Sequence, residues 1–163
     1  MNANDICLIL NSSVNSYRRL DPHFEAPNQI KVSASDRGSM IRIPIGNERS
    51  ARIEVRSIAP DSNPYLAIYA LLKTGLEGPE NEEDKDGKRA RTRFLPDNIY
   101  DAIRMFKSSR FAQSLLGPQV HEKYAELKLA SAERCAKALG SIVKPSEIQF
   151  HYEVTNQYLW SRF

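Results

Sequence analysis

Alternation of apolar and polar residues predicts a pair of short strands in the first half of the chain. Apolar side chains recur at alternate positions in residues 40–45 and again in residues 51–58, and Gly46-Asn47 forms a turn between the two segments. Successive side chains of a strand point to opposite faces, so Ile53 and Val55 are expected on one face. The opposite, polar face of this hairpin is expected to carry Arg42, Arg52, Glu54 and Arg56.

The segments before the hairpin have weaker patterns. Residues 6–10 form an apolar run that is too short for periodicity to separate a helical turn from a strand. Residues 11–20 are rich in Asn and Ser and predict a loop. Pro22 and Pro27 keep the next stretch extended, as a plain surface connection, a binding loop or a lid. Residues 29–35 predict a half-buried strand, whose apolar positions are Ile30, Val32 and Ala34.

Helix signals dominate from residue 63 onward. Asn63-Pro64 is predicted to cap and open a helix. Residues 65–72 are apolar on nearly all sides, so this helix is expected to be buried, and Gly75 is expected to end it. A second helix is expected to open at Pro96-Asp97. Its apolar stripe, at positions i, i+3, i+4 and i+7, comprises Ile99, Ala102, Ile103 and Phe106.

Three more helices are predicted toward the C-terminus. A short one spans residues 111–116 and ends at Gly117-Pro118, a long one spans residues 119–139 and ends at Gly140, and a last one begins at residues 144–146. The inward positions of the long helix are expected to be Val120, Tyr124, Leu127 and Cys135. The lone histidines are interpreted as structural residues: His121 and His151.

Composition limits the possible classes of protein. A chain of 163 residues, 26% charged and 41% hydrophobic, is expected to fold as one domain with a real core. Its net charge of +3 is milder than nucleic-acid binders show, although residues 88–93 are arginine-rich. No segment approaches the length of a membrane span. Cys7 and Cys135 lack the spacing of a zinc site or a disulfide framework and are interpreted as reduced thiols of a cytoplasmic protein.

The density of arginine around Glu54 allows two interpretations. In one, the polar face is an exposed surface with cross-strand ion pairs, each worth roughly 0.2–1 kcal/mol. In the other it binds polyanions, because guanidinium forks match phosphate and carboxylate groups. With Arg37 and Arg49 nearby in sequence, five arginines could surround one carboxylate. Glu54 could also hold Mg²⁺ or Mn²⁺, but one carboxylate is too few for a metal site.

Five motifs, in order, resemble the C-terminal part of glutamine synthetases. They are NSYRRL at 15–20, FEAP at 24–27, DRGSMIRIP at 36–44, ARIEVR at 51–56 and NPYLAIYALLKTGLEG at 63–78. The resemblance is weaker after residue 78. The closing YLWSRF at 158–163 is more similar to the γ-glutamyl-polyamine ligases of the same family.

The resemblance implies an ATP-dependent ligase that joins glutamate to ammonia or another amine through γ-glutamyl phosphate, with Mg²⁺ or Mn²⁺. Glu25, on a flap, and Arg37, which touches glutamate and the transferred phosphate, are the implied catalytic residues. Glu54 is the implied metal ligand. The implied glutamate-binding residues are Arg19, Glu25, Arg37 and Arg56. The implied ATP-binding residues are Arg37, Arg42, Arg49 and Arg52.

The resemblance also implies the fold and the assembly. We expect an α+β fold in which an antiparallel sheet packs against helices, as the C-terminal part of a bifunnel catalytic domain with a helical C-terminal tail. Residues 1–78 would form a partial catalytic core, 79–95 a charged loop and 96–163 the helical part of the same domain. The family assembles as homo-oligomeric rings, typically dodecamers, in the cytoplasm, so the expected partners are other synthetase subunits rather than nucleic acid or membrane.

The chain departs from the family pattern in three places. Ser12-Ser13 stands where Pro-Thr usually precedes the NSY motif, and Asp36 stands where Asn often precedes the arginine at position 37. The family's other metal ligands precede the NSY motif, whereas only fourteen residues do so here. We therefore expect one half of a site, inactive on its own. The alternative is a non-catalytic module that binds glutamate, nucleotide or full-length synthetase subunits.

Overall fold

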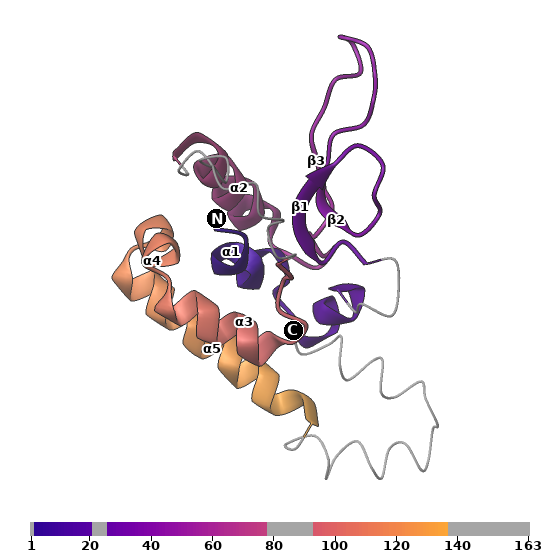
Figure 1. The fold of residues 1–163 in the computed structure, drawn as a ribbon. Helices are drawn as coiled ribbons and strands as arrows, with labels where there is room; N and C mark the ends of the chain where they lie inside the picture. The colour runs from indigo at the N-terminus through magenta and orange to yellow at the C-terminus, as the bar shows by residue number, and fades with distance from the viewer. Residues whose placement is uncertain (1, 21–25, 78–92, 137–163) are drawn as a thin grey trace, which may run out of the picture.

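A computed structural model describes residues 2–20, 26–77 and 93–136, which form a helical body with a small sheet on one side (Figure 1). The expected α+β class is confirmed. Among the described helices, none combines the length and apolarity needed to span a bilayer. In chain order the elements are α1 (Ala3–Leu10), η1 (Val14–Leu20), β1 (Gln29–Ser33), β2 (Ser39–Arg42), β3 (Glu54–Val55), α2 (Pro64–Glu77), α3 (Ile99–Ser108), α4 (Arg110–Leu116) and α5 (Pro118–Ala136).

Helix α1 forms the centre of the body. The apolar run at residues 6–10, for which the sequence allowed either a helix or a strand, is helical, and its side chains are buried. α1 packs most extensively against α3 and also contacts α2 and α4 (Figure 1). Burial raises the pKa of the Cys7 thiol from its usual 9.0 to about 12, despite a hydrogen bond from Asn11. The core therefore begins at the first helix of the chain.

Helix α3 matches its predicted pattern. Asn98 caps it by accepting a hydrogen bond from the backbone N–H of Asp101 at 2.9 Å. Helix α4 follows immediately, with Ser109 as its N-cap, and Gly117 ends it with φ 76°. Both helices are confirmed to within the usual variation of helix ends. All four residues of the predicted stripe of α3 are buried: Ile99, Ala102, Ile103 and Phe106.

The long helix α5 is confirmed, but its inward face is not the predicted one. Val120 and Leu127 are exposed, so that part of the prediction is wrong. Because α5 lies close against α3, small side chains fill the contact, and Ala125 and Ala132 are buried. Tyr124 is half-buried as expected, whereas the side chain of Cys135 lies outside the described residues.

His121 has the structural role expected from the sequence. Its ring stacks on Phe106, with ring centroids 4.5 Å apart, and its Nε2 lies 2.8 Å from the carbonyl oxygen of Phe106. The ring is buried where α5 crosses α3. This histidine therefore fixes the packing of two helices.

Helix α2 begins as predicted but is not buried. The side-chain oxygen of Asn63 accepts hydrogen bonds from two N–H groups of the first turn, at 3.0 and 3.2 Å. Only Ala67 and Ala70 are buried, because the helix lies at the edge of the body with one face outward (Figure 1). The helix also passes through Gly75, which was expected to end it, and continues to Glu77.

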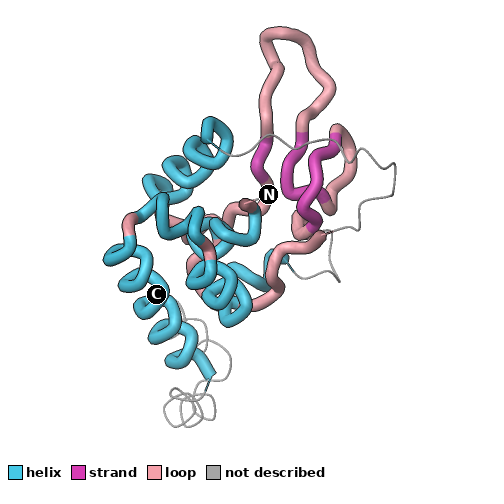
Figure 2. The backbone as a smooth tube through the Cα atoms, turned by 60° about the vertical axis from the view of Figure 1, so that its left-hand side comes forward, coloured by secondary structure: helices cyan, strands magenta, loops and turns pink. Residues whose placement is uncertain are grey.

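The sheet has the order β1-β2-β3. β2 and β3 pair in antiparallel fashion, as the predicted hairpin requires, whereas β1 pairs with β2 in parallel rather than the expected antiparallel direction. The strands are shorter than predicted, because pairing ends at Arg42 and Glu54, and residues 43–53 form a loop that projects beyond the sheet (Figure 2). The outer edge of β1 is bridged by Phe94. Val32, predicted to face inward, is exposed.

The Asn- and Ser-rich segment is not a loop, because residues 14–20 form the 3₁₀ helix η1. Ser13 and Ser16 stabilise its start, since each side-chain oxygen accepts the other residue's backbone N–H at 3.2 Å. Such local bonds satisfy a helix terminus as readily as a turn. The predicted charged loop at 79–95 lies outside the described residues as far as residue 92, and the predicted last helix lies wholly outside them.

Candidate functional site: the arginine face of the hairpin

The polar face of the β2–β3 hairpin brings three of the predicted site residues together. Arg42 and Glu54 are directly opposite in the ladder, and Arg42 reaches Oε2 of Glu54 with Nε at 2.7 Å and Nη2 at 2.6 Å. Arg52 reaches Oε1 with Nε at 2.8 Å and Nη2 at 2.7 Å. Two guanidinium forks therefore hold one carboxylate, an arrangement that fixes both arginines geometrically.

This cluster carries a net positive charge. Partial burial raises the pKa of Glu54, but the hydrogen bonds from Arg52 and Arg42 and the positive charges of both arginines together lower it by more, so the pKa of this carboxylate is below its usual value. Its side chain is 25% exposed, and both arginines remain accessible to solvent. Two cations around one anion leave an excess of positive charge that a phosphate or carboxylate ligand could bind.

Arg19, Arg37 and Arg56 form a second group. Nη2 of Arg19, on η1, donates to the backbone carbonyl oxygen of Arg56 at 3.2 Å. Nη1 of Arg56 in turn donates to the carbonyl oxygen of Arg37. These contacts connect three segments that are distant in sequence. A carbonyl oxygen holds a guanidinium group in place while adding no opposing formal charge.

Arg56 continues the ladder on which Arg42 and Glu54 pair. Glu54 and Arg56 are two positions apart, so they share a face at a separation of about 7 Å along the chain. The backbone N–H of Arg56 donates to the carbonyl oxygen of Met40 at 2.8 Å, which keeps Arg56 beside β2. The opposite face of the ladder packs against the core through Ile41 and Val55. The sequence pattern therefore located the polar face correctly over this short ladder.

An ion pair that sequence reasoning missed lies at the start of β2. Nζ of Lys31 is 2.5 Å from Oδ2 of Asp36, and the N–H of Gly38 donates to Oδ1 at 2.7 Å. The hydrogen bond from Lys31, and then that from Gly38, lowers the pKa of Asp36, and the charge of Arg56 adds to this effect. The sequence pattern marked Lys31 only as a polar position of a strand. The ion pair could not be predicted from it, because the fold alone brings β1 beside this turn.

A cavity of about 440 Å³ lies beside Arg19. Asp61 forms part of its wall and accepts hydrogen bonds from the hydroxyl groups of Ser13 and Ser16, the latter at 2.9 Å. This serine–aspartate group was not predicted as a site, although two serines at the start of a helix are a recognisable capping signal. The cavity is lined by Asn15, Ser16, Arg18, Arg19, Ala59, Pro60 and Asp61.

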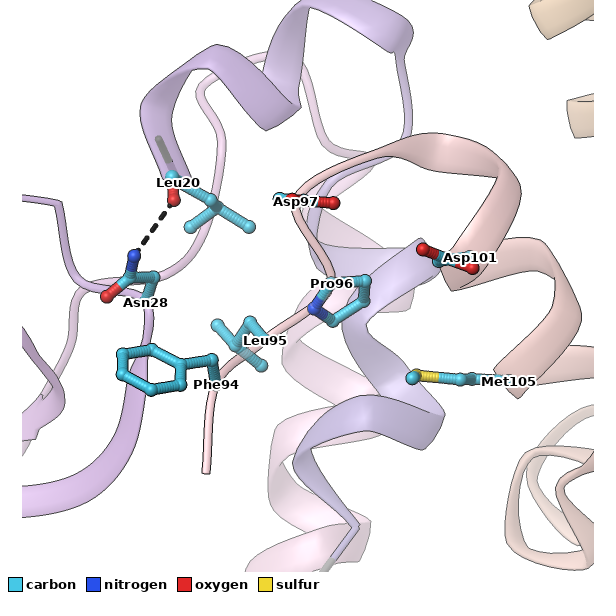
Figure 3. Close-up of a pocket in the computed structure, with 8 residues that line it drawn as sticks. All are labelled: Leu20, Asn28, Phe94, Leu95, Pro96, Asp97, Asp101 and Met105. Atoms are coloured by element: carbon cyan, nitrogen blue, oxygen red, sulfur yellow. Dashed lines mark hydrogen bonds between the residues drawn. The ribbon is translucent and has the colours of Figure 1, made fainter. Parts of the chain in front are cut away.

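A second cavity, of about 380 Å³, has a different character. Figure 3 shows Phe94 and Leu95 on one side of it and Met105 on the other, with Asp97 and Asp101 on the side of α3. Asn28, at its edge, donates to the carbonyl oxygen of Leu20 at 3.1 Å. Among the described residues no arginine lines this cavity, and its mainly apolar walls and two carboxylates do not suit a polyanion.

The remaining predicted residues lie elsewhere. Glu25 falls outside the described residues. Arg49 is in the projecting loop, in a turn where its backbone N–H donates to the side chain of Asn47 at 3.1 Å. The described residues contain no group of three or more His, Cys, Asp or Glu side chains suited to a metal ion. Glu54 alone, with both oxygens bound to arginine, does not fit Mg²⁺ or Mn²⁺.

Comparison with known proteins gives consistent similarities. A family model described as "Glutamine synthetase, catalytic domain" matches residues 1–148. A glutamine synthetase of Methanosarcina mazei is 38% identical over 130 residues, covering 71% of this chain and 29% of that protein. One from Staphylococcus epidermidis is 33% identical over 141 residues, covering 78% and 32%. A solved structure titled "Apo GmaS without ligand" matches with a TM-score of 0.62 and 30% identity, covering 80% of this chain and 32% of that one. The chain spans about a third of the length of these relatives.

Proposed function

Because the chain belongs to the glutamine synthetase family, as the C-terminal part of the catalytic domain, we propose that it supplies the arginine-lined half of a site that makes glutamine. In the proposed reaction, the γ-carboxylate of glutamate attacks the γ-phosphorus of ATP, which forms γ-glutamyl phosphate and releases ADP. Ammonia then attacks the acyl carbon, phosphate leaves, and a base takes the surplus proton. The observation that carries this proposal is the hairpin face, on which Glu54 holds Arg42 and Arg52 and a backbone carbonyl oxygen holds the side chain of Arg56, while Arg19 is bound beside it.

The two groups of arginines have different proposed ligands. Arg42 and Arg52, together with Arg49 from the projecting loop, are proposed to contact the phosphates of ATP. The fork geometry of guanidinium suits phosphate oxygens, and charge on the transferred phosphoryl group must be balanced in the transition state. Because Glu54 already aligns two of these arginines, little ordering remains to be done when ATP binds.

Arg19, Arg37 and Arg56 are proposed to bind glutamate. Arg19 also lines the 440 Å³ cavity, which offers space for a small carboxylate ligand. Arg37, whose carbonyl oxygen accepts a hydrogen bond from Arg56, is proposed to touch both glutamate and the transferred phosphate. Glu25, which lies outside the described residues, is proposed from its FEAP motif to help remove the proton from the incoming ammonium.

The described residues do not form a complete catalytic site. On the hairpin face they contribute one carboxylate, Glu54, whose oxygens are both bound to arginine, so no step that needs a metal is assigned to this chain. Phosphoryl transfer depends on several cations placed around the phosphate oxygens. We therefore propose that the isolated chain does not make glutamine, and that activity requires the rest of the catalytic domain.

A chimera tests the proposal. The 130-residue segment of the Methanosarcina mazei enzyme that matches this chain is replaced by the corresponding residues of this chain, and glutamine formation is measured. We expect the chimera to be active, and Arg56→Lys to raise KM for glutamate about tenfold or more, because lysine keeps the charge but cannot fork. KM for ATP should change less. Arg104→Lys, at an exposed pair with Asp101, is the matched control and should change neither constant.

Three results would overturn the proposal. A folded chimera without activity would show that these residues do not complete the site. An unchanged KM for glutamate in Arg56→Lys would remove Arg56 from substrate binding. Glutamine formation by the isolated 163-residue chain, supplied with glutamate, ammonium, ATP and Mg²⁺, would contradict the proposed dependence on the rest of the domain.

A further inference from the structure

The outward face of α2 is a continuous apolar stripe. Because successive helical residues advance by about 100°, positions spaced three and four apart fall on one side. The stripe is formed by Tyr65, Ile68, Tyr69, Leu72 and Leu76, whose exposed fractions range from 42% to 85%. The charged residues Lys73 and Glu77 pair with each other at 3.2 Å beside the stripe and do not interrupt it. A helix face without any charge is unusual for a surface in contact with water.

The stripe is presented by an anchored helix. Ala67 and Ala70 are buried on its inner side, and the hydroxyl of Tyr69 donates to the carbonyl oxygen of Leu115 at 3.0 Å. The helix backbone that carries the five apolar side chains is therefore held against the body. Folded monomers rarely expose contiguous apolar patches larger than a few hundred Å², and larger ones mark interaction sites.

A second exposed apolar group lies at the same end of the molecule. It consists of Ile43, Ile45 and Ile53, in the loop that projects from β2 and β3. α2 and this loop both lie in the upper part of Figure 1 and of Figure 2. Two separate apolar surfaces at one end indicate that this end of the body receives a further layer of protein.

We propose that the apolar face of α2 is the surface on which the preceding part of a glutamine synthetase catalytic domain packs, whether the same polypeptide or another carries that part. About two thirds of each relative's chain lies outside the segment that matches here, and that chain must cover some surface of this segment. The hydrophobic effect favours the largest exposed apolar face. This inference rests on family membership and goes beyond the proposed reaction.

Two other occupants fit the structure less well. A second copy of the chain would meet α2 through a single helix of 14 residues, about 21 Å long, which is small for the ~800 Å² per partner of a stable interface. The second is the segment after α5: α5, the last described helix, runs toward the lower part of Figure 1, whereas α2 lies in its upper part. Neither occupant accounts for the isoleucines of the loop.

Co-expression tests the inference with matched variants. The 163-residue chain is produced together with the tagged part of the Methanosarcina mazei enzyme that precedes its matched segment, and copurification is measured. The matched segment of that enzyme serves as the positive control for the tagged part. Leu72→Glu is compared with Leu127→Glu, because both leucines are on helices and are 59% and 60% exposed, but only Leu72 belongs to the stripe.

We expect the wild-type chain and Leu127→Glu to copurify, and Leu72→Glu to lose binding by about tenfold or more. Alone, Leu72→Glu should keep the wild-type Tm, because an exposed leucine supports no internal packing. Equal copurification of both variants, or no binding by a wild-type chain whose positive control binds, would overturn the inference. A lowered Tm of isolated Leu72→Glu would also overturn it, since another part of this chain, or a second copy, would then cover the stripe. Glutamine formation is not part of this readout, so its outcome is separate from that of the proposed reaction.

Discussion

Asn11 connects the central helix to the segment that carries the arginine face, and its removal should weaken the whole protein. Its side-chain Nδ2 donates to the carbonyl oxygen of Ser57 at 2.9 Å, and the residue is fully buried. Ser57 follows Arg56 directly, so this bond fixes the strand next to the proposed glutamate-binding group. A second link, from the N–H of Ala59 to the carbonyl oxygen of Leu10 at 2.9 Å, involves only backbone atoms, so a side-chain substitution at Asn11 leaves it in place.

The size of the effect follows from the partners left behind. Asn11→Ala leaves the buried carbonyl of Ser57 without this donor, which costs about 1–3 kcal/mol, and opens a small cavity. The side-chain oxygen of Asn11 is buried and has no hydrogen-bond partner among the described residues. Removing it relieves an unfavourable burial and therefore offsets part of the destabilisation. We expect a net destabilisation of about 2 kcal/mol, or about 4–8 °C in Tm for a chain of this size.

Urea unfolding and calorimetry of the 163-residue chain measure this prediction. Ser12→Ala is the control: among the described residues its hydroxyl makes one long bond, of 3.4 Å, to the carbonyl oxygen of Asp61, so the change should stay within about 0.5 kcal/mol. Asn11→Asp should be worse than Asn11→Ala at neutral pH, because it places a carboxylate against a carbonyl oxygen. If Asn11→Ala and Ser12→Ala prove equally mild, the amide is not the anchor and the reasoning is refuted.

Three further predictions concern the cap of α2, an ion pair and a thiol. Asn63→Ala should destabilise the protein by about 1 kcal/mol in urea unfolding, and Asn63→Asp, which can still cap, should not. Lys31→Gln should raise the pKa of Asp36 toward its usual value in an NMR titration of the carboxyl carbon, since Lys31 is the main cause of the lowered value. An unchanged pKa of Asp36 in Lys31→Gln would contradict the assignment of Lys31 as the main cause. Because the folded pKa of Asp36 is depressed, its contribution to stability is present above the unfolded pKa and is lost as pH falls through the folded pKa. In Cys135→Ser, the thiol of Cys7 should resist disulfide reagents at pH 8 until urea is added, because burial raises its pKa to about 12; a fast reaction of the folded protein would contradict its burial. Because this pKa is raised in the folded state, the free energy of unfolding should also fall as the pH rises from 9 to 12.

Local signals were sufficient for some elements of the fold. The stripe of α3 and the glycine after α4 specify those helices within a few residues of sequence, and both are confirmed. The burial of α2 could not be predicted in the same way. An apolar helix normally faces a core, but whether a core is present on both sides depends on chain that is distant in sequence or absent from it. The exposure of Val120 could not be predicted for the same reason: which face of α5 is buried depends on α3, and the buried residues of that face include alanines.

The candidate site shows a similar division. Alternation predicted that Arg42, Glu54 and Arg56 share a face, because that depends on neighbouring residues alone. It could not predict that Arg19 reaches the carbonyl oxygen of Arg56, a contact across 37 positions of sequence. The ligand assignments for these arginines came from the family motifs and stay predictions. The ion pair of Lys31 was missed because nothing in a strand pattern indicates which turn will lie beside it.

The order of the strands has a consequence for how the domain is completed. Phe94 closes the side of the sheet that β1 would otherwise offer, so among the described strands only β3 is left as a margin where pairing can continue. A strand added there would run alongside Glu54. Pairing of that strand with β3 would then also place its side chains beside the arginine face. A change that prevents the pairing would remove those side chains from the site.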